Sequence, residues 1–205
     1  MNFEHRSIRI QPQLGHAHPH DAPYQLGDVW DIPLQPTPSL RPPHVEDLVL
    51  TGPGRRIDRL ADVGSWIMQG VTPWRGSATA VFDATLRRSE SGRAFVGREG
   101  IPSGSVGFWL PDRPLVRAER GERPPHYVYT DHDGLRWRFS YAGAAPSLRI
   151  VPARSLVRLS LARWWAPDDG SLPEACYAQV SGWYPIDAEA TDALASPQRH
   201  EMPAW

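Results

Sequence analysis

Proline and glycine interrupt this chain so often that they decide what it can fold into. Its 205 residues include 22 prolines and 17 glycines, which divide the sequence into short pieces. Proline lacks the backbone N–H that a helix interior needs, and both residues favour turns. The pattern therefore predicts a mostly β protein made of short strands and loops. No apolar run approaches the roughly 20 residues of a membrane helix, so we expect no membrane partner.

Helical spacing occurs between residues 55 and 88. Apolar side chains recur there three or four positions apart, at Ile57, Leu60, Val63 and Ile67. Ser77 is a suitable N-cap for a second segment that ends near Leu86. We expect one or two short helices in this region.

Patterns typical of strands fill most of the remaining sequence. They lie at residues 24–34, 48–50, 94–96, 105–110, 147–151, 156–164 and 176–184. The two ends, residues 1–23 and 185–205, have no apolar period that a core would bury. We therefore expect a flexible N-terminal segment that is dispensable for folding and a loosely ordered C-terminal tail.

The clearest local signal is a hairpin at residues 126–141. Asp133-Gly134 suits a two-residue type I′ turn, which would place Tyr129 opposite Arg138 and Asp131 opposite Arg136. In this register the face expected to be buried holds Val128, Thr130, Leu135, Trp137 and Phe139. The face expected to be exposed holds Tyr127, Tyr129, Asp131, Arg136 and Arg138. A slip by one residue would exchange the two faces of a strand.

Charge and cysteine usage narrow the environment and the partners. The formal net charge is −1, so binding to nucleic acid by bulk charge is excluded and any such site is a local patch. Every basic residue other than histidine is arginine, which suits a small phosphate-binding patch. The single cysteine, Cys176, forms no internal disulfide, and the first ten residues lack an export signal. We expect a cytoplasmic protein.

The sequence shows no recognisable catalytic motif, and we expect neither catalysis nor a cofactor. The segment 104–107 misses the spacing of a hydrolase nucleophile turn, and Cys176 lies in a predicted strand as a buried, inert thiol. The hairpin turn accounts for Asp131, His132 and Asp133. His44 and Glu46 face the same way on an extended segment but lack a third partner. His16, His18 and His20 are interpreted as a solvated loop, with a metal site as the alternative.

Aromatic and basic residues suggest a binding surface. Trp164 and Trp165 are adjacent, so on a strand they point to opposite faces and one of them is a candidate for stacking. Together with the hairpin they suggest a surface on which bases stack on rings and arginines meet the phosphates of single-stranded DNA or RNA. Its predicted members are Tyr127, Tyr129, Arg136, Arg138, Arg158, Arg163 and Trp164.

Several segments resemble one family in matching order. They are residues 26–34, 43–47, 105–110, 138–143, 159–161 and 176–181, and they are similar to segments of the dual OB-containing domain family of prokaryotes. The resemblance implies two OB-like barrels packed together, over residues 24–110 with the helical insertion and residues 111–184. It also implies nucleic-acid binding in a defence system, and it transfers no catalytic residue. Both ends of the chain depart from the family pattern.

Three hypotheses of function follow. The first is a non-catalytic nucleic-acid-binding accessory protein, or a subunit of a larger prokaryotic defence complex. The second is a scaffold that binds proteins and has no intrinsic affinity for nucleic acid, since abundant Trp, Tyr and Arg suit both kinds of interface. The third is a small metal-dependent enzyme that uses the His-rich N-terminus.

Overall fold

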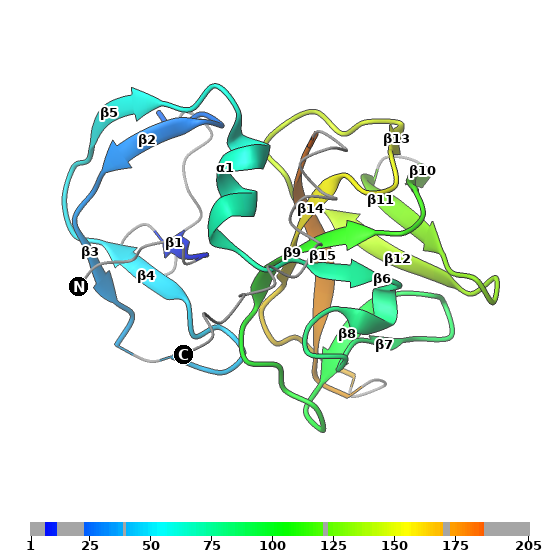
Figure 1. The fold of residues 1–205 in the computed structure, drawn as a ribbon. Helices are drawn as coiled ribbons and strands as arrows, with labels where there is room; N and C mark the ends of the chain where they lie inside the picture. Colours follow the sequence, from blue (N-terminus) through cyan, green and yellow to red (C-terminus); the bar gives the residue numbers. More distant parts are fainter. Residues whose placement is uncertain (1–6, 12–22, 39, 121–122, 170–172, 187–205) are drawn as a thin grey trace, which may run out of the picture.

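The protein is mostly β, as its sequence predicts. A computed structural model describes residues 7–11, 23–38, 40–120, 123–169 and 173–186. Figure 1 shows two groups of strands on either side of a single α-helix. The His-rich segment, residues 16–20, and most of the C-terminal tail lie outside the described residues.

The smaller group contains the first five strands. Strand β1 pairs in parallel with β4, β3 pairs with the other edge of β4, and β2 pairs with β5. Their bounds are β1 Arg9–Gln11, β2 Asp28–Asp31, β3 Leu34–Pro36, β4 Asp47–Leu50 and β5 Arg55–Arg59. Residues 9–11 thus form a paired strand inside the segment that we expected to be flexible.

The larger group is one sheet of ten strands. Its main path runs β13-β10-β11-β12-β15-β14-β9-β6, and β8 joins β15 from the side and carries β7. The bounds are β6 Trp74–Gly76, β7 Arg87–Arg88, β8 Ala94–Gly97, β9 Val106–Pro111, β10 Leu115–Arg120, β11 Arg123–Thr130, β12 Arg136–Tyr141, β13 Ile150–Val151, β14 Leu156–Leu161 and β15 Ala175–Tyr184.

The sheets are not closed, so the expectation of two OB-like barrels is not confirmed. The path of the large sheet ends at β13 and at β6, which do not pair with each other. Residue 110 is the expected boundary between the two halves. Strands from both sides of this residue belong to the large sheet, because β9 pairs with β14.

The helical region contains one α-helix, α1 Val63–Gly70, and a 3-10 helix at Ala78–Ala80. Asp62 caps α1 by accepting a hydrogen bond from the backbone N–H of Ser65. Ser77 caps the 3-10 helix as predicted, but this helix ends at Ala80 and does not continue to Leu86. The helical pattern at Ile57 is misleading, because Arg55–Arg59 pairs with β2 as strand β5. Sheet pairing overrides the local spacing there.

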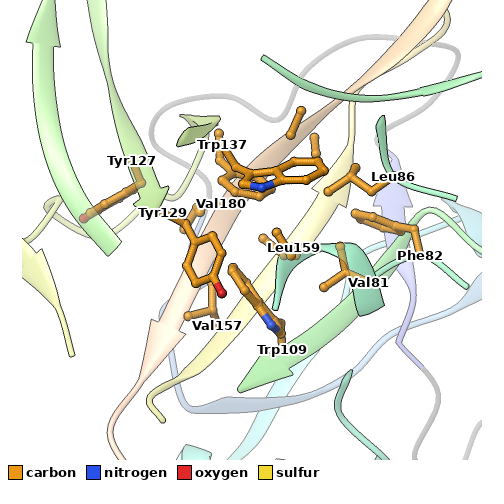
Figure 2. Packing of buried hydrophobic residues seen from close by; sticks show 14 of the residues in the cluster. Val81, Phe82, Leu86, Trp109, Tyr127, Tyr129, Trp137, Val157, Leu159 and Val180 are labelled. Carbon is orange, nitrogen blue, oxygen red and sulfur yellow. The ribbon is translucent and has the colours of Figure 1, made fainter. Parts of the chain in front are cut away.

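One apolar core lies on the inner side of the large sheet. Trp109 of β9 is fully buried, and its ring centroid lies 5.1 Å from that of Tyr129 and 5.9 Å from that of Phe139. Figure 2 shows Trp109 and Tyr129 beside Val157, Leu159 and Val180, and Phe82, Leu86 and Phe139 belong to the same cluster. Strands from β8 to β15 therefore share a single core.

The hairpin forms, but the predicted register is wrong. Tyr129 lies opposite Trp137 and Val128 lies opposite Arg138, one residue away from the predicted pairs. As a result Tyr127 and Tyr129 are fully buried, whereas Thr130 and Leu135 are exposed. The second strand is as predicted, with Trp137 and Phe139 buried and Arg136 exposed.

The turn explains the change of register. Only Gly134 has positive φ (78°), whereas a type I′ turn needs two such residues. The backbone N–H of Asp131 donates to Leu135, so the loop has three residues instead of two. The Asp131 carboxylate accepts hydrogen bonds from the Asp133 and Leu135 backbone N–H groups and from Trp137 Nε1. These bonds fix the longer loop and turn the tyrosines towards the core.

Three consecutive residues with left-handed backbone follow the 3-10 helix. Phe82, Asp83 and Ala84 have φ of 51°, 56° and 58°, a conformation that costs non-glycine residues roughly 1–2 kcal/mol each. Neighbouring contacts hold the turn: Phe82 is fully buried, its carbonyl accepts from Thr85, and Asp83 accepts from the Ser103 N–H at 2.7 Å.

We therefore predict that Ala84→Gly stabilises the protein by about 0.5–1 kcal/mol, because Ala84 is exposed and glycine removes the left-handed strain. Urea unfolding measures the change. The matched control is Ala80→Gly at an exposed position of the 3-10 helix, which should destabilise the protein by about 0.5–1 kcal/mol. Equal effects of the two substitutions would contradict the strain argument.

Candidate nucleic-acid interface

The outer side of the large sheet is covered in one half and open in the other. Helix α1 packs Ile67 and Met68 against Leu110 of β9 and Leu156 of β14. The remaining outer side carries several exposed apolar side chains, including Val116, Ile150 and Trp165, which are about half exposed. The half that α1 leaves uncovered is therefore accessible to a ligand.

Strand register defines the members of this uncovered half, which we call the open face. Paired residues lie on the same side of a sheet and alternate residues lie on opposite sides. The open face therefore contains the side chains opposite to the core: Ile150, Val116, Ala118, His126, Val128, Thr130, Arg136, Arg138, Ser140, Gln179, Tyr177, Phe95 and Arg93.

Two shallow grooves hollow the open face. One, of about 650 Å³, runs between the β7–β8 turn and the hairpin and includes Arg88, Glu90, Arg136 and Arg138. The other, of about 400 Å³, includes Arg113, Val116 and Arg136. Because Ala118, Val128 and Arg136 line both, the grooves are continuous across β10, β11 and β12.

The open face carries a local excess of positive charge. Arg93 and Arg136 of this face are exposed, as is Arg88, which pairs with Ala94 but lines the larger groove, and none of the three forms an ion pair within the described residues. Arg138 is half-buried and donates through one guanidinium nitrogen to the Ser91 carbonyl, so part of its hydrogen bonding is internal. Glu90 is the acidic residue that lines the larger groove. The near-neutral chain thus carries a local basic patch.

The structure separates the seven residues of the predicted surface. Tyr127 and Tyr129 are buried, and their hydroxyls donate to the Leu148 carbonyl and to Asp112. Their expected exposure is therefore wrong, and neither ring is accessible to a base. Arg136 and Arg138 lie on the open face as predicted.

The other three predicted residues lie towards the N-terminal strands. Arg158 is largely buried, and desolvation lowers the pKa of its guanidinium; the same group donates to Ser181. Arg163 pairs with Asp47 at 2.6 Å. The Trp164 indole donates to the Pro42 carbonyl and lies beneath the Arg98 guanidinium, 3.9 Å from the ring centroid. The contacts of Arg163 and Trp164 assign these two residues to the junction between the two groups of strands, whereas the hydrogen bond of Arg158 joins β14 to β15 within the large sheet.

Sequence reasoning missed the aromatic residues that do lie on the open face. Tyr177 of β15 pairs with Phe95 of β8, and their ring centroids are 6.2 Å apart. Trp165 lies 6.0 Å from Tyr177, and the Arg93 guanidinium lies 4.8 Å from the Tyr177 centroid. The adjacent tryptophans were the available signal, but the predicted surface included Trp164, whereas the exposed member of the pair is Trp165.

A second polar cluster is buried where β4 meets the large sheet. Glu46 accepts two hydrogen bonds from Ser105, at 2.8 Å from the backbone N–H and 2.6 Å from the hydroxyl. His44 Nε2 lies 3.8 Å from the Cys176 sulfur. Ser105 and Cys176 are the partners that His44 and Glu46 lacked in the sequence, 59 and 132 positions away along the chain. Short-range spacing does not reveal such distant neighbours.

This cluster does not have the geometry of a nucleophilic site. The Ser105 hydroxyl donates to Glu46, while His44 contacts Cys176, so no histidine stands next to the hydroxyl as a base. Burial raises the pKa of the Cys176 thiol to about 12, which keeps it protonated. Among the described residues no three His, Cys, Asp or Glu side chains form a group able to hold a metal ion.

Arg9 ties the cluster to the large sheet. Its guanidinium donates to the Ser105 hydroxyl at 2.6 Å and to the Leu161 carbonyl at 3.1 Å, and its Nε lies 3.6 Å from Asp47. Asp47, which is buried, also accepts from Gln11. Strand β1 is thus held by charged hydrogen bonds to groups with little access to water, where such bonds are strong.

We predict that Arg9→Ala lowers the free energy of unfolding by about 2–3 kcal/mol, because it removes an ion-pair partner of the buried Asp47 and the donor to the Ser105 hydroxyl and the Leu161 carbonyl. Urea unfolding is the measurement. Arg55→Ala is the matched control, since its side chain is 80% exposed, and it should change stability by less than about 0.5 kcal/mol. An Arg9 variant as stable as wild type would mean that the N-terminal strand is dispensable, as the sequence alone suggested.

His44 gives the protein a pH-dependent stability. Desolvation, assisted by repulsion from Arg9 and Arg163, lowers its pKa to about 4 from an ordinary value near 6.5. Between these values the unfolded chain binds a proton that the folded chain rejects. Stability should therefore fall as the pH drops from about 6.5 to about 4, with a limiting slope of about 1.4 kcal/mol per pH unit. Unfolding curves across this range for wild type and His44→Gln test this, and the variant should lose that component of the slope.

The chain matches no protein-family model, and comparisons with curated proteins and with solved structures found no match. The resemblance to the dual OB-containing domain family therefore stays a prediction that rests on the segments quoted above. No helix among the described residues is long and apolar enough to cross a membrane.

Proposed function

We propose that the open face binds nucleic acid, with its arginines in contact with the phosphate backbone. The observation that carries the proposal is the local excess of arginine beside the grooves, on a chain whose net charge is −1. Arg88, Arg93 and Arg136 have no acidic partner in the described parts of the chain, so their charge is available to a ligand. Arginine binds phosphate through two parallel hydrogen bonds, which suits a small patch of few residues.

The shape of the face supports a chain-like ligand. The two grooves join across three adjacent strands, and neighbouring strands are spaced about 4.8 Å apart. The floor is apolar, because Val116, Ala118 and Val128 lie between the arginines. A polyanion with flat apolar bases matches a surface that alternates cationic and apolar groups.

The same proposal includes a role as an accessory subunit of a prokaryotic defence complex in the cytoplasm. This part of the proposal rests on the family resemblance alone. No residue of the open face is assigned catalysis. The exposed Val116, Leu135 and Ile150 also suit a protein partner, which is the competing hypothesis.

The test is a binding titration at several salt concentrations with a single-stranded oligonucleotide. Arg88→Gln combined with Arg136→Gln should weaken binding and reduce the log–log salt slope by about 1.4 units, since each phosphate contact on a single strand contributes roughly 0.7. Fluorescence anisotropy of the labelled oligonucleotide measures both quantities.

Arg55→Gln combined with Arg75→Gln is the matched control. It removes the same charge from exposed positions outside the open face and should leave the slope unchanged. If both double variants reduced the slope equally, the open face would not be the binding surface. If wild type bound neither single-stranded nor duplex DNA or RNA at low salt, the proposed function would be wrong for this chain.

A further inference from the structure

The aromatic cluster at one end of the open face is not explained by core packing. Trp165 is 50% exposed, although its ring lies against Tyr177. Phe95 and Tyr177 are half-buried and complete a row of three rings across β8, β15 and the segment that follows β14. An exposed tryptophan beside two further rings is a large apolar surface for a protein to leave in contact with water.

The cluster is continuous with the cationic part of the face. Arg93 lies over the Tyr177 ring and its backbone pairs with Arg138 of β12. The order across the sheet is therefore Trp165, Tyr177, Arg93, Arg138, with rings at one end and guanidinium groups at the other. A ligand that spans both ends must offer a flat π surface at one end and an anionic group at the other.

The chemistry of the row favours nucleobases. Tilted rings and a guanidinium group are surfaces on which planar bases stack, and this stacking tolerates different base sequences. In a duplex both flat sides of an interior base are already stacked, so this interaction is available only to unpaired bases. An apolar protein segment would use the rings but would have no need of the adjoining arginines.

We propose that Trp165, Tyr177 and Phe95 form a stacking subsite for unpaired bases, so that the open face selects single strands over duplexes. This inference rests on the proposed function, because the phosphates of the same strand contact Arg93 and Arg136. Trp165 is the principal stacking residue, since its ring is the most exposed of the three. Arg93 orients the Tyr177 ring and contacts the adjoining phosphate.

The experiment compares two ligands that differ only in their bases. One is a short single-stranded oligothymidylate, and the other is an oligomer of the same length and backbone in which every base is missing. Wild type should bind the oligothymidylate roughly tenfold more tightly than the abasic oligomer and more tightly than the same strand in a duplex. Trp165→Ala should remove most of this preference without changing affinity for the abasic oligomer, and Trp165→Phe should restore part of it.

Trp66→Ala is the matched control, because Trp66 is similarly exposed, at 46%, but lies on α1. It should leave both affinities unchanged. Equal binding of the two oligomers by wild type would overturn the stacking subsite and leave the phosphate-binding function standing. Binding of neither oligomer at low salt would overturn both proposals and favour a protein partner for the aromatic cluster.

Discussion

The carboxylate of Asp131 determines which chemistry this protein shows to solvent. It accepts two backbone N–H groups of the hairpin loop and the Trp137 indole N–H, and so fixes a loop of three residues. A loop shorter by one residue would exchange the faces of β11 and place Val128 and Thr130 against Trp109. These hydrogen bonds therefore place the tyrosines of β11 on the core side, whereas Arg136 and Arg138 of β12 lie on the outer side in either register. These bonds hold the pKa of Asp131 below its ordinary value, the bond from Trp137 most of all.

The sequence alone predicted the class of structure and most of the strands, because these features depend on local patterns of residues. Proline and glycine set the strand lengths, and Leu156–Leu161 alternates so clearly that its buried side is evident. The sequence alone did not predict strand β5 or the register of the hairpin, because each depends on partners outside the short segment in which a local pattern is recognised. The Asp133-Gly134 pair is compatible with two turns, and the hydrogen bonds of Asp131 together with the packing of Tyr129 against Trp109 select the longer one. The sequence also predicted half of the candidate site, because the alternation of β12 places Arg136 and Arg138 on its outer side. It did not predict the other half, because Tyr177 and Phe95 pair across 82 residues of sequence and no local pattern encodes that pairing.

The buried charges at the junction complete the division of the sheet into two halves. Arg9, Asp47 and Arg163 hold the N-terminal strands close to β14, and Arg41 and Arg98 share Glu174 beside Trp164. One half of the outer surface is thereby used for internal contacts. Arginines that look alike in the sequence consequently have different roles: Arg9 and Arg163 pair with Asp47 at the junction, whereas Arg88 and Arg136 are exposed to water.

The β7–β8 hairpin enters the sheet from the side, and this gives the groove a wall that can evolve independently of the core. Gly92 anchors the hairpin, because its carbonyl accepts from Arg138 and a Cβ at this position would lie 2.9 Å from the Arg136 carbonyl oxygen. Glu90 and Ser91, in contrast, form an exposed rim. Insertions or substitutions at this rim would change the width and charge of the groove while the strands that carry Trp109 and Phe139 keep their packing. Related chains could in this way acquire different ligand preferences on an unchanged scaffold.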